Sequence, residues 1–230
     1  MTEKHFLFSL IFLLVCFPSC KKDSLHPDVP DEVTDIDGNT YKIVQIGTQW
    51  WMAENLRVTH YRNGTPIPEV SDNNQWVNLS SGAYCNISND SLNADIYGRL
   101  YNWYAVHDNQ NIAPEGWHVP DNSDWEVLIN FLGGSNISGG KLKEAGLDHW
   151  HNPNYGATNE TGFNALPAGM RSNSGYFIEN GINAYFWSSS ESNDYTGFAF
   201  LLSYGHAEMI RYGKDKQLGF SIRCVKDQGN

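Results

Sequence analysis

The apolar residues between positions 121 and 134 show the clearest helical spacing in the chain. They recur at i, i+3, i+4 and i+7, as Trp125, Leu128, Ile129 and Leu132. Asp121 stands before them, where an N-cap residue is expected, and Gly133-Gly134 follows them, where a left-handed residue stops a helix. The sequence therefore predicts an amphipathic helix that begins after Asp121 and ends before the two glycines.

Residues 34–56 alternate between apolar and polar positions, with two turn signals between the alternating runs. Asp37-Gly38 precedes the segment Tyr41–Ile46, and Gly47-Thr48 separates that segment from QWWMAENL. This pattern predicts two linked β-hairpins at the start of the folded region.

The end of the chain also has strand character. Four segments rich in aromatic and β-branched residues follow one another at residues 184–190, 196–204, 206–212 and 218–225. Gly205 and the segment Gly213–Asp215 are the turn signals between them. We expect four closing strands in an antiparallel meander.

The middle of the chain is less regular. Helical spacing predicts a helix over Asp95–His107 and a short one from Ser138, as its cap, to Gly146, whereas residues 57–95 and 147–177 are rich in Asn, Gly and Ser. Because residues 57–95 are long for a loop inside a compact domain, we interpret them as a functional loop. The fold class is predicted as α+β, with two main helices, antiparallel sheet and long irregular loops.

The N-terminus has the pattern of a targeting segment. Residues 6–17 are almost wholly apolar but too few to span a bilayer, which indicates a signal peptide over residues 1–19. The sequence FPSC ending at Cys20 resembles a bacterial lipoprotein cleavage site, so Cys20 is the predicted lipid-attachment residue; an ordinary signal peptide with unmodified Cys20 is the alternative. Residues 20–35 are acidic and contain two prolines, as expected of a solvated tether.

Composition limits the remaining choices. The 230 residues are 40% hydrophobic and 13% aromatic, which fits one globular domain, predicted here over residues 36–228. The formal net charge of −11 argues against nucleic acid as a partner. If Cys16 leaves with the signal peptide and Cys20 carries lipid, Cys85 and Cys224 remain in an oxidising compartment, and we predict a disulfide between them, with two unpaired thiols as the alternative.

Several long motifs resemble a known family. They are DIDGNTYKIVQIGTQWWMAENLR, YGRLYNWYAV, GWHVPDNSDWEVLI, ALPAGMR, FWSSSES and LGFSIRCV. Together they resemble the Fibrobacter succinogenes major paralogous domain, from about Ile36 to Val225. That resemblance implies an exported protein or lipoprotein of the Bacteroidetes type, without an established biochemical activity.

A more distant resemblance concerns the fold. The capped helix around Trp125-Glu126 and the closing motif from Gly219 to Cys224 are similar to those of C-type-lectin-like folds and of formylglycine-generating enzymes. This implies a C-type-lectin-like architecture. Many members of the first family carry a cysteine before YGRLY; this chain lacks it, which leaves Cys85 free to pair with Cys224.

No group of residues points to catalysis. The carboxylates offer no pair that spacing would select for glycoside cleavage, and His149 and His151 lack an identifiable third metal ligand, so a surface loop is the better interpretation. No cofactor and no catalytic or metal residue is predicted. The loop from Asn86 to Asp95 is the one place where a structural calcium ion would fit.

Aromatic residues in the irregular segments are the candidate ligand contacts. They are Trp76, Trp150, Tyr155, Tyr176 and Tyr195. For each of them a half-buried packing role is the competing interpretation. Five other tryptophans are assigned to the core: Trp50, Trp51, Trp103, Trp117 and Trp125.

The sequence as a whole therefore predicts a lipid-anchored protein of the cell envelope, at the outer membrane, on its periplasmic face or at the cell surface. Its expected role is a non-catalytic binding or adhesion module for a glycan or an envelope protein. Two alternatives stay open: an exported enzyme that acts on polysaccharide or protein, and a structural component of a surface appendage.

Overall fold

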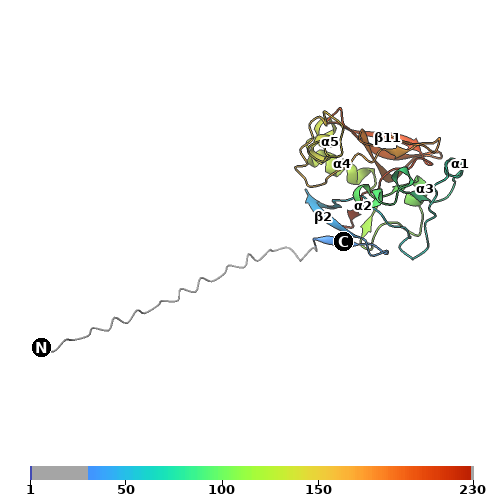
Figure 1. The fold of residues 1–230 in the computed structure, drawn as a ribbon, viewed down its shortest axis with the longest axis horizontal. Coiled ribbons are helices and arrows are strands. Elements are labelled where there is room, and N and C mark those ends of the chain that lie inside the picture. Colours follow the sequence, from blue (N-terminus) through green and yellow to red (C-terminus); the bar gives the residue numbers. More distant parts are fainter. Residues whose placement is uncertain (2–30, 229–230) are drawn as a thin grey trace. The chain divides into compact units, whose positions relative to one another are not determined.

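The computed structural model describes residues 31–228, together with Met1 (Figure 1). The predicted signal peptide (1–19), Cys20 and the tether up to residue 30 lie outside the described residues. The folded unit starts at Asp31. It therefore includes residues 31–35, which the sequence predicts as tether, because residues 32–34 pair with 40–42 as the first strand.

The described residues contain antiparallel sheets and several short helices, which confirms the α+β class. In chain order the elements are β1 (Glu32–Thr34), β2 (Thr40–Ile46), β3 (Gln49–Met52), α1 (Asn73–Trp76), β4 (Tyr84–Cys85), the 3₁₀ turn η1 (Ile87–Asn89), α2 (Asn93–Tyr97), β5 (Leu100–Tyr101), α3 (Trp103–Val106), β6 (Trp117–His118), α4 (Asn122–Phe131), α5 (Ser135–Leu142), β7 (Met170–Arg171), β8 (Phe177–Ile178), β9 (Asn183–Asn193), β10 (Thr196–Ser203), β11 (Met209–Asp215) and β12 (Val225–Lys226).

The first two hairpins are confirmed and form most of a five-stranded sheet, in the order β1-β2-β3-β12-β6. Thr40 pairs with Thr34 across the turn at Gly38, and Ile46 pairs with Gln49 across the turn at Gly47. Near the C-terminus, β12 inserts between β3 and β6. Both ends of the described chain therefore belong to one sheet.

The predicted helix after Asp121 is confirmed as α4. The Asp121 carboxylate accepts from the Asp124 N–H at 3.0 Å, and the Asp124 carboxylate accepts from the Asp121 N–H at 3.0 Å, so the two form a capping box. At the other end, the Gly134 N–H donates to the Ile129 carbonyl at 2.9 Å. The glycines end the helix, as the sequence predicts.

Three of the four predicted closing strands form a sheet in the order β11-β10-β9. The fourth, residues 218–225, forms regular strand only at Val225, because its earlier residues bridge to three different segments: Gly219 to Arg171, Phe220 to Tyr101 and Ser221 to Phe186. The predicted turn over Gly213–Asp215 is also wrong. Those residues continue β11 and pair with residues 196–198 of β10.

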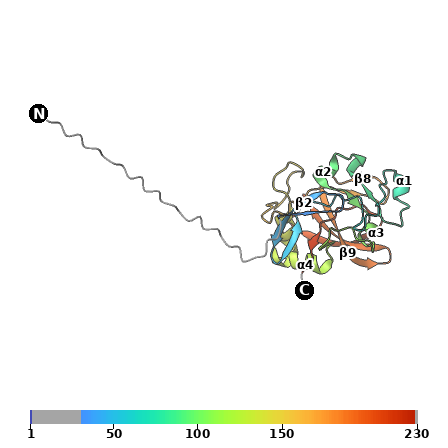
Figure 2. The same ribbon diagram turned by 90° about the horizontal axis from the view of Figure 1, so that it is seen from below.

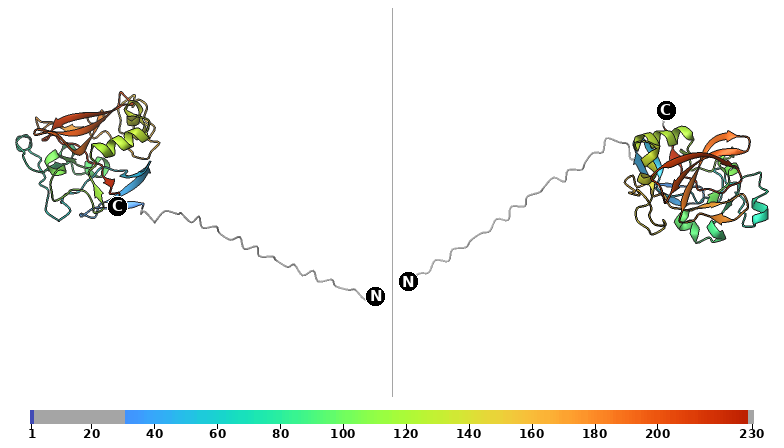
Figure 3. Two further views of the ribbon diagram at one scale, coloured as in Figure 1. Left: turned by 180° about the vertical axis from the view of Figure 1, so that it is seen from behind. Right: turned by 90° about the horizontal axis from the view of Figure 1, so that it is seen from above.

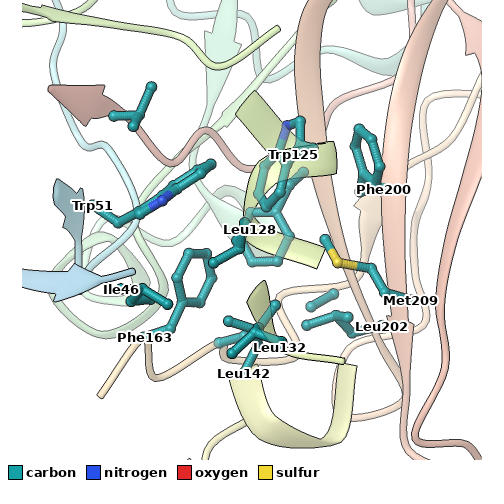
Figure 4. Close-up of a cluster of buried hydrophobic side chains, with 14 of the residues drawn as sticks. Ile46, Trp51, Trp125, Leu128, Leu132, Leu142, Phe163, Phe200, Leu202 and Met209 are labelled. Atoms are coloured by element: carbon teal, nitrogen blue, oxygen red, sulfur yellow. The ribbon is translucent and has the colours of Figure 1, made fainter. Parts of the chain in front are cut away.

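The main core lies between these two sheets (Figure 4). Trp51 comes from β3 on one side, and Phe200 from β10 on the other. Trp125 of α4 lies between them, with ring centroids 4.8 Å from Trp51 and 4.9 Å from Phe200. Four of the tryptophans assigned to the core are buried, and Trp50 is half-buried. The amphipathic helix is thus the layer that joins both sheets.

The predicted helix over Asp95–His107 is wrong. Its residues divide into α2, β5 and α3, because Gly98 adopts φ +71° and ends α2, after which Leu100 pairs with Cys85 as strand. The predicted cap at Ser138 is wrong as well, since α5 begins at Ser135 and Ser138 lies inside it. The two longest described helices are therefore α4 and α5.

Buried cations hold the long irregular segments in place. Arg171 is fully buried; its guanidinium donates to the carbonyls of Gly175, Val70 and Ser71. Through Asn73 it also joins α1 to β7, and Figure 2 shows α1 and β8 on the same side of the folded unit. The carbonyls of Val70 and Ser71 thus gain the donors that a regular sheet would otherwise supply.

Among the residues that the structure describes, we find no helix with the length and apolar character needed to cross a bilayer. This finding applies to residues 31–228 and Met1. The apolar run at residues 6–17 is not among them.

Candidate functional site

A groove of about 550 Å³ lies where α3 meets the ends of β9 and β10. Four segments distant in the sequence line it, through Ser80–Gly82, five residues of 103–109, Glu191 and Lys216. We call this cavity the Trp103 groove. It combines an aromatic residue, an imidazole, two carboxylates and an ammonium group, which is the mixture of apolar surface and convergent polar groups found in ligand sites.

Asn102 positions one wall of the groove. It is the N-cap residue of α3, where its side-chain oxygen accepts from the Ala105 N–H at 3.1 Å. The same oxygen accepts from the Ala83 N–H at 3.0 Å, and its amide donates to the Ser81 carbonyl at 2.8 Å. One buried side chain therefore begins the helix and holds the Ser81–Ala83 segment beside it.

Trp103 lies against the end of the three-stranded sheet. Its indole N–H donates to the Ser188 carbonyl at 3.0 Å. A Cβ atom at Gly197 would lie 2.2 Å from Trp103 Cδ1, so the close approach requires glycine at that position. The His107 ring stacks on Trp103 with centroids 4.5 Å apart and is itself exposed. His107 is therefore the accessible part of this stack.

Lys216 supplies the positive charge of the groove. It is buried, lies 4.6 Å from the Trp103 ring centroid, pairs with Glu191 and donates to the Asp194 carbonyl at 2.9 Å. The hydrogen bond from Lys216 lowers the pKa of Glu191, which stays ionised. Half of the Glu191 side chain remains open to solvent, so its carboxylate is available to a ligand.

Asp108 is the second carboxylate of the groove. Its Oδ1 accepts from the Gln110 N–H at 2.9 Å. Burial, followed by the nearby Asp108 charge, raises the pKa of the Tyr61 hydroxyl well above its usual range. Counting Asp108, Glu191 and Lys216, the groove carries a small negative charge.

Two of the five predicted ligand contacts are buried, which overturns their assignment. Trp76 is fully buried under the Arg171 guanidinium, at 4.4 Å from its ring centroid. Trp150 is 2% exposed, and its indole N–H donates to the Ala165 carbonyl at 3.0 Å. Both tryptophans pack loops onto the core. Neither is available to stack against a ligand.

The other three predicted contacts are exposed tyrosines, but they do not lie together. Tyr195 follows Asp194, whose carbonyl accepts from the Lys216 ammonium group, and the Tyr195 carbonyl accepts from the Lys216 backbone N–H at 3.1 Å. Tyr176 belongs to a turn that reaches Asp215 through Asn173. The Tyr155 backbone N–H donates to the Tyr204 carbonyl, beyond the opposite end of β10. None of the three lines the groove, and only Tyr195 is hydrogen-bonded to a residue that does, Lys216.

The predicted disulfide is not formed. Cys85 and Cys224 are both free and buried. Cys85 packs in a cluster with Trp76 and Leu100, whereas Cys224 lies beside β3, where its carbonyl accepts from the Met52 N–H at 3.0 Å. Burial raises the pKa of Cys85 to about 12 and that of Cys224 further still. Both groups are therefore protonated, unreactive thiols.

The histidines at 149 and 151 do not act together. His149 Nδ1 lies 2.9 Å from a Glu144 oxygen, while His151 lies against Gly181. No metal-binding group of three or more His, Cys, Asp or Glu side chains occurs among the described residues. In the predicted calcium loop, the amide groups of Asn86 and Asn93 donate to Glu69 and to the Ile87 carbonyl. A calcium ion there stays a prediction.

Sequence reasoning missed the groove because its residues come from separate segments. Trp103 is correctly predicted as a core residue, but its burial alone does not show that His107 and Lys216 flank it. Glu191 stands in a serine-rich strand end and Lys216 directly after β11, where the sequence gives no signal of a site. Only the pairing of β10 with both neighbours brings the two together.

Comparison with known proteins gives one match. The model of the Fibrobacter succinogenes major domain family matches residues 44–226. That range includes α4, the three-stranded sheet and every residue that lines the Trp103 groove. No curated protein and no solved structure matches the chain. The chain therefore belongs to the Fibrobacter succinogenes major domain family.

Proposed function

We propose that this protein is a lipid-anchored, non-catalytic binding module of the cell envelope, and that the Trp103 groove holds its glycan or protein partner. The observation that carries the proposal is the composition of the groove: His107 stacked on Trp103, with an ionised Glu191 beside it. The anchor is Cys20, and its expected location is the outer membrane. The net charge of −11 supports a partner other than nucleic acid.

A glycan is the better-supported partner. Sugar rings present flat apolar faces and many hydroxyl groups, so they suit a site in which aromatic surface lies next to carboxylates and amides. Glu191 and Asp108 are acceptors for hydroxyl groups, and Tyr195 adds an exposed aromatic ring. We further propose that the fold is C-type-lectin-like. The pair α4 and α5 and the antiparallel sheets support that assignment.

The groove also suggests the main alternative, an enzyme that cleaves polysaccharide. Glycoside hydrolysis uses two carboxyl groups, one of them protonated. Glu191 is held ionised by Lys216, which suits hydrogen bonding to a ligand more than proton donation. Turnover of a polysaccharide that Glu191→Gln abolishes would replace the binding proposal with this one.

The test is a glycan array followed by titration calorimetry, with a parallel capture of partners from outer-membrane material. His107→Ala and Tyr195→Ala are expected to weaken binding about fivefold each, because each removes aromatic contact worth about 1 kcal/mol. Tyr155→Ala is the matched control. Tyr155 is another exposed tyrosine, beyond the far end of β10, and its replacement should leave affinity unchanged.

Two results would contradict the proposal. One is a glycan array and an outer-membrane capture that both yield no binder. The other is a glycan whose affinity falls with Tyr155→Ala but not with His107→Ala, because the ligand would then occupy a different surface.

A further inference from the structure

Among residues 31–228, no strand pairs with the outer side of the three-stranded sheet at one of its edges. β11 is the outermost strand in the order β11-β10-β9, and Arg211, Tyr212, Gly213 and Asp215 are exposed along it. It follows the outer margin of the folded unit in Figures 1 and 3. Unpaired edge strands are templates for a further strand. We propose that β11 is an interface that pairs, antiparallel, with β11 of a second copy of this chain.

The register of β10 with β11 shows which backbone groups point outward. The Lys216 backbone N–H points toward β10 and donates to the Tyr195 carbonyl. From there the pairing continues without a shift, from Thr196 with Asp215 to Leu202 with Met209. Because backbone groups alternate between the two sides of a strand, those of Arg211, Gly213 and Asp215 point away from β10. The groups of Arg211 and Gly213 are the donors and acceptors for the second copy, because the Asp215 carbonyl already accepts from the Leu218 N–H at 3.0 Å.

A two-fold axis at Tyr212 satisfies those groups and matches the side chains. In that register Arg211 lies opposite Gly213 of the second copy, which leaves room for the arginine. Tyr212 faces Tyr212 as a non-hydrogen-bonded pair, the type in which side chains approach more closely. Arg211 and Asp215 of the second copy are diagonal neighbours on one face, so the interface gains two ion pairs of opposite charge.

The local surroundings support the same occupant. On one face Arg211 reaches Glu126 of α4 at 2.8 Å, and a cavity of about 310 Å³ lies between α4 and β11, lined in part by Ile129, Phe200 and Met209. On the other face Ile210 is half-buried and Tyr212 is 41% exposed. An added strand would cover apolar atoms on both faces, as strand addition at a sheet edge requires.

The test measures self-association by sedimentation velocity over a concentration series. Two forms are compared: the full chain in detergent, and a chain that starts at Asp31, which contains every described helix and strand. Gly213→Pro removes an outward N–H in each copy, at an edge where proline is tolerated, and should raise the dissociation constant at least about tenfold. Gly213→Ala keeps the N–H and should change the dissociation constant by less than about threefold.

Further variants test the register itself. Arg211→Asp should weaken the dimer, and the double variant Arg211→Asp with Asp215→Arg should restore it. Glu126→Gln removes only the ion pair within one chain and should not weaken the dimer. Tyr212→Cys should form a disulfide-linked dimer under mild oxidation. Leu92→Cys, an exposed control at the start of α2 and outside this sheet, should not.

Several outcomes would overturn the proposal. One is a wild-type protein that stays monomeric up to about millimolar concentration, where even weak specific pairing would populate a dimer. Another is a dimer that persists in Gly213→Pro when circular dichroism shows an intact fold. A monomeric wild type that binds a different protein through β11, with binding lost in Gly213→Pro, would assign the edge to that other partner.

Discussion

Single buried cations hold the irregular segments of this protein in place by donating hydrogen bonds to their backbone carbonyls. Lys143 is fully buried, and its ammonium group donates to the carbonyls of Tyr155, Ser203 and His206 at 2.8 to 2.9 Å. Burial lowers its pKa to about 8. No carboxylate pairs with it within the described part of the chain. Backbone carbonyls take the place of a counter-ion and join three segments.

Lys143→Met is expected to destabilise the protein by about 2 to 4 kcal/mol, because three buried carbonyls lose their donor while the apolar stem is preserved. Urea unfolding followed by fluorescence would measure the change. Lys141→Met on the same helix is the control: its partly exposed ion pair with Glu160 should contribute about 1 kcal/mol or less. Equal losses in both variants would refute this role.

The ionisation of Lys143 makes the free energy of unfolding depend on pH, and the sign of that dependence follows from its pKa. Its pKa in the folded state lies below the ordinary value of 10.5, so the unfolded state binds more protons between about pH 8 and 10.5. This residue therefore makes the protein more stable as pH rises through that window, and less stable below it. Lys143→Met should abolish that contribution.

Residue-level reasoning from sequence identified burial better than exposure. Trp51 and Trp125 are core residues as predicted, since large aromatics in periodic segments are buried by the fold that they define. Trp76 and Trp150 are candidate ligand contacts in the sequence because they stand in Asn- and Gly-rich segments, with packing as the competing interpretation. Those segments are held down by Arg171 and Lys143, and sequence alone does not show which carbonyls a cation will reach.

Among the elements, α4 was predictable because both of its ends are encoded locally. Asp121 caps it, and glycines stop it. The segment 95–107 failed for the opposite reason. Its apolar spacing comes from α2, β5 and α3, whose buried faces are set by distant partners such as Cys85. Periodicity reports which residues are buried, but not whether one element or three buries them.

Asp121→Ala should destabilise the protein by about 1 kcal/mol, because it removes the acceptor for the Ser123 and Asp124 N–H groups and breaks the capping box. Thermal unfolding would measure the loss. Asn130→Ala, an exposed position on the same helix, is the control and should stay within about 0.5 kcal/mol of wild type. A cap variant with wild-type stability would show that packing alone fixes α4.

At the scale of the whole molecule, His118 joins the C-terminal segment to α4. Its Nε2 lies 3.0 Å from Asp124 and its Nδ1 2.6 Å from Asp227. The hydrogen bond with Asp124 is the main reason that the pKa of His118 is raised above 6.5, and Asp227 adds to it. One imidazole therefore links β6, the start of α4 and the end of the described chain.

The stability that His118 contributes should be complete below pH 6.5 and should be lost as pH rises through its raised folded-state pKa, because the folded state holds the proton more tightly. NMR titration of the imidazole should give a midpoint above 6.5. His118→Gln should flatten the pH dependence of stability in this window. A midpoint at or below 6.5 would contradict the charged bridge.

The architecture as a whole was predictable in outline: hairpins, one capped helix and a closing antiparallel sheet. The Trp103 groove and the free edge of β11 were not, because both depend on strand order and on segments that meet only in the folded chain. Sequence patterns describe each strand's two faces, but they do not tell which strand has no neighbour.

The two unpaired thiols have a practical meaning for how stability depends on redox conditions. The thiols of Cys85 and Cys224 are buried and un-ionised, so the fold of the described residues does not depend on an oxidant. The free energy of unfolding should therefore be the same with and without a reducing agent. The stability of the fold rests on packed rings and on carbonyl-bound cations, which are indifferent to redox potential.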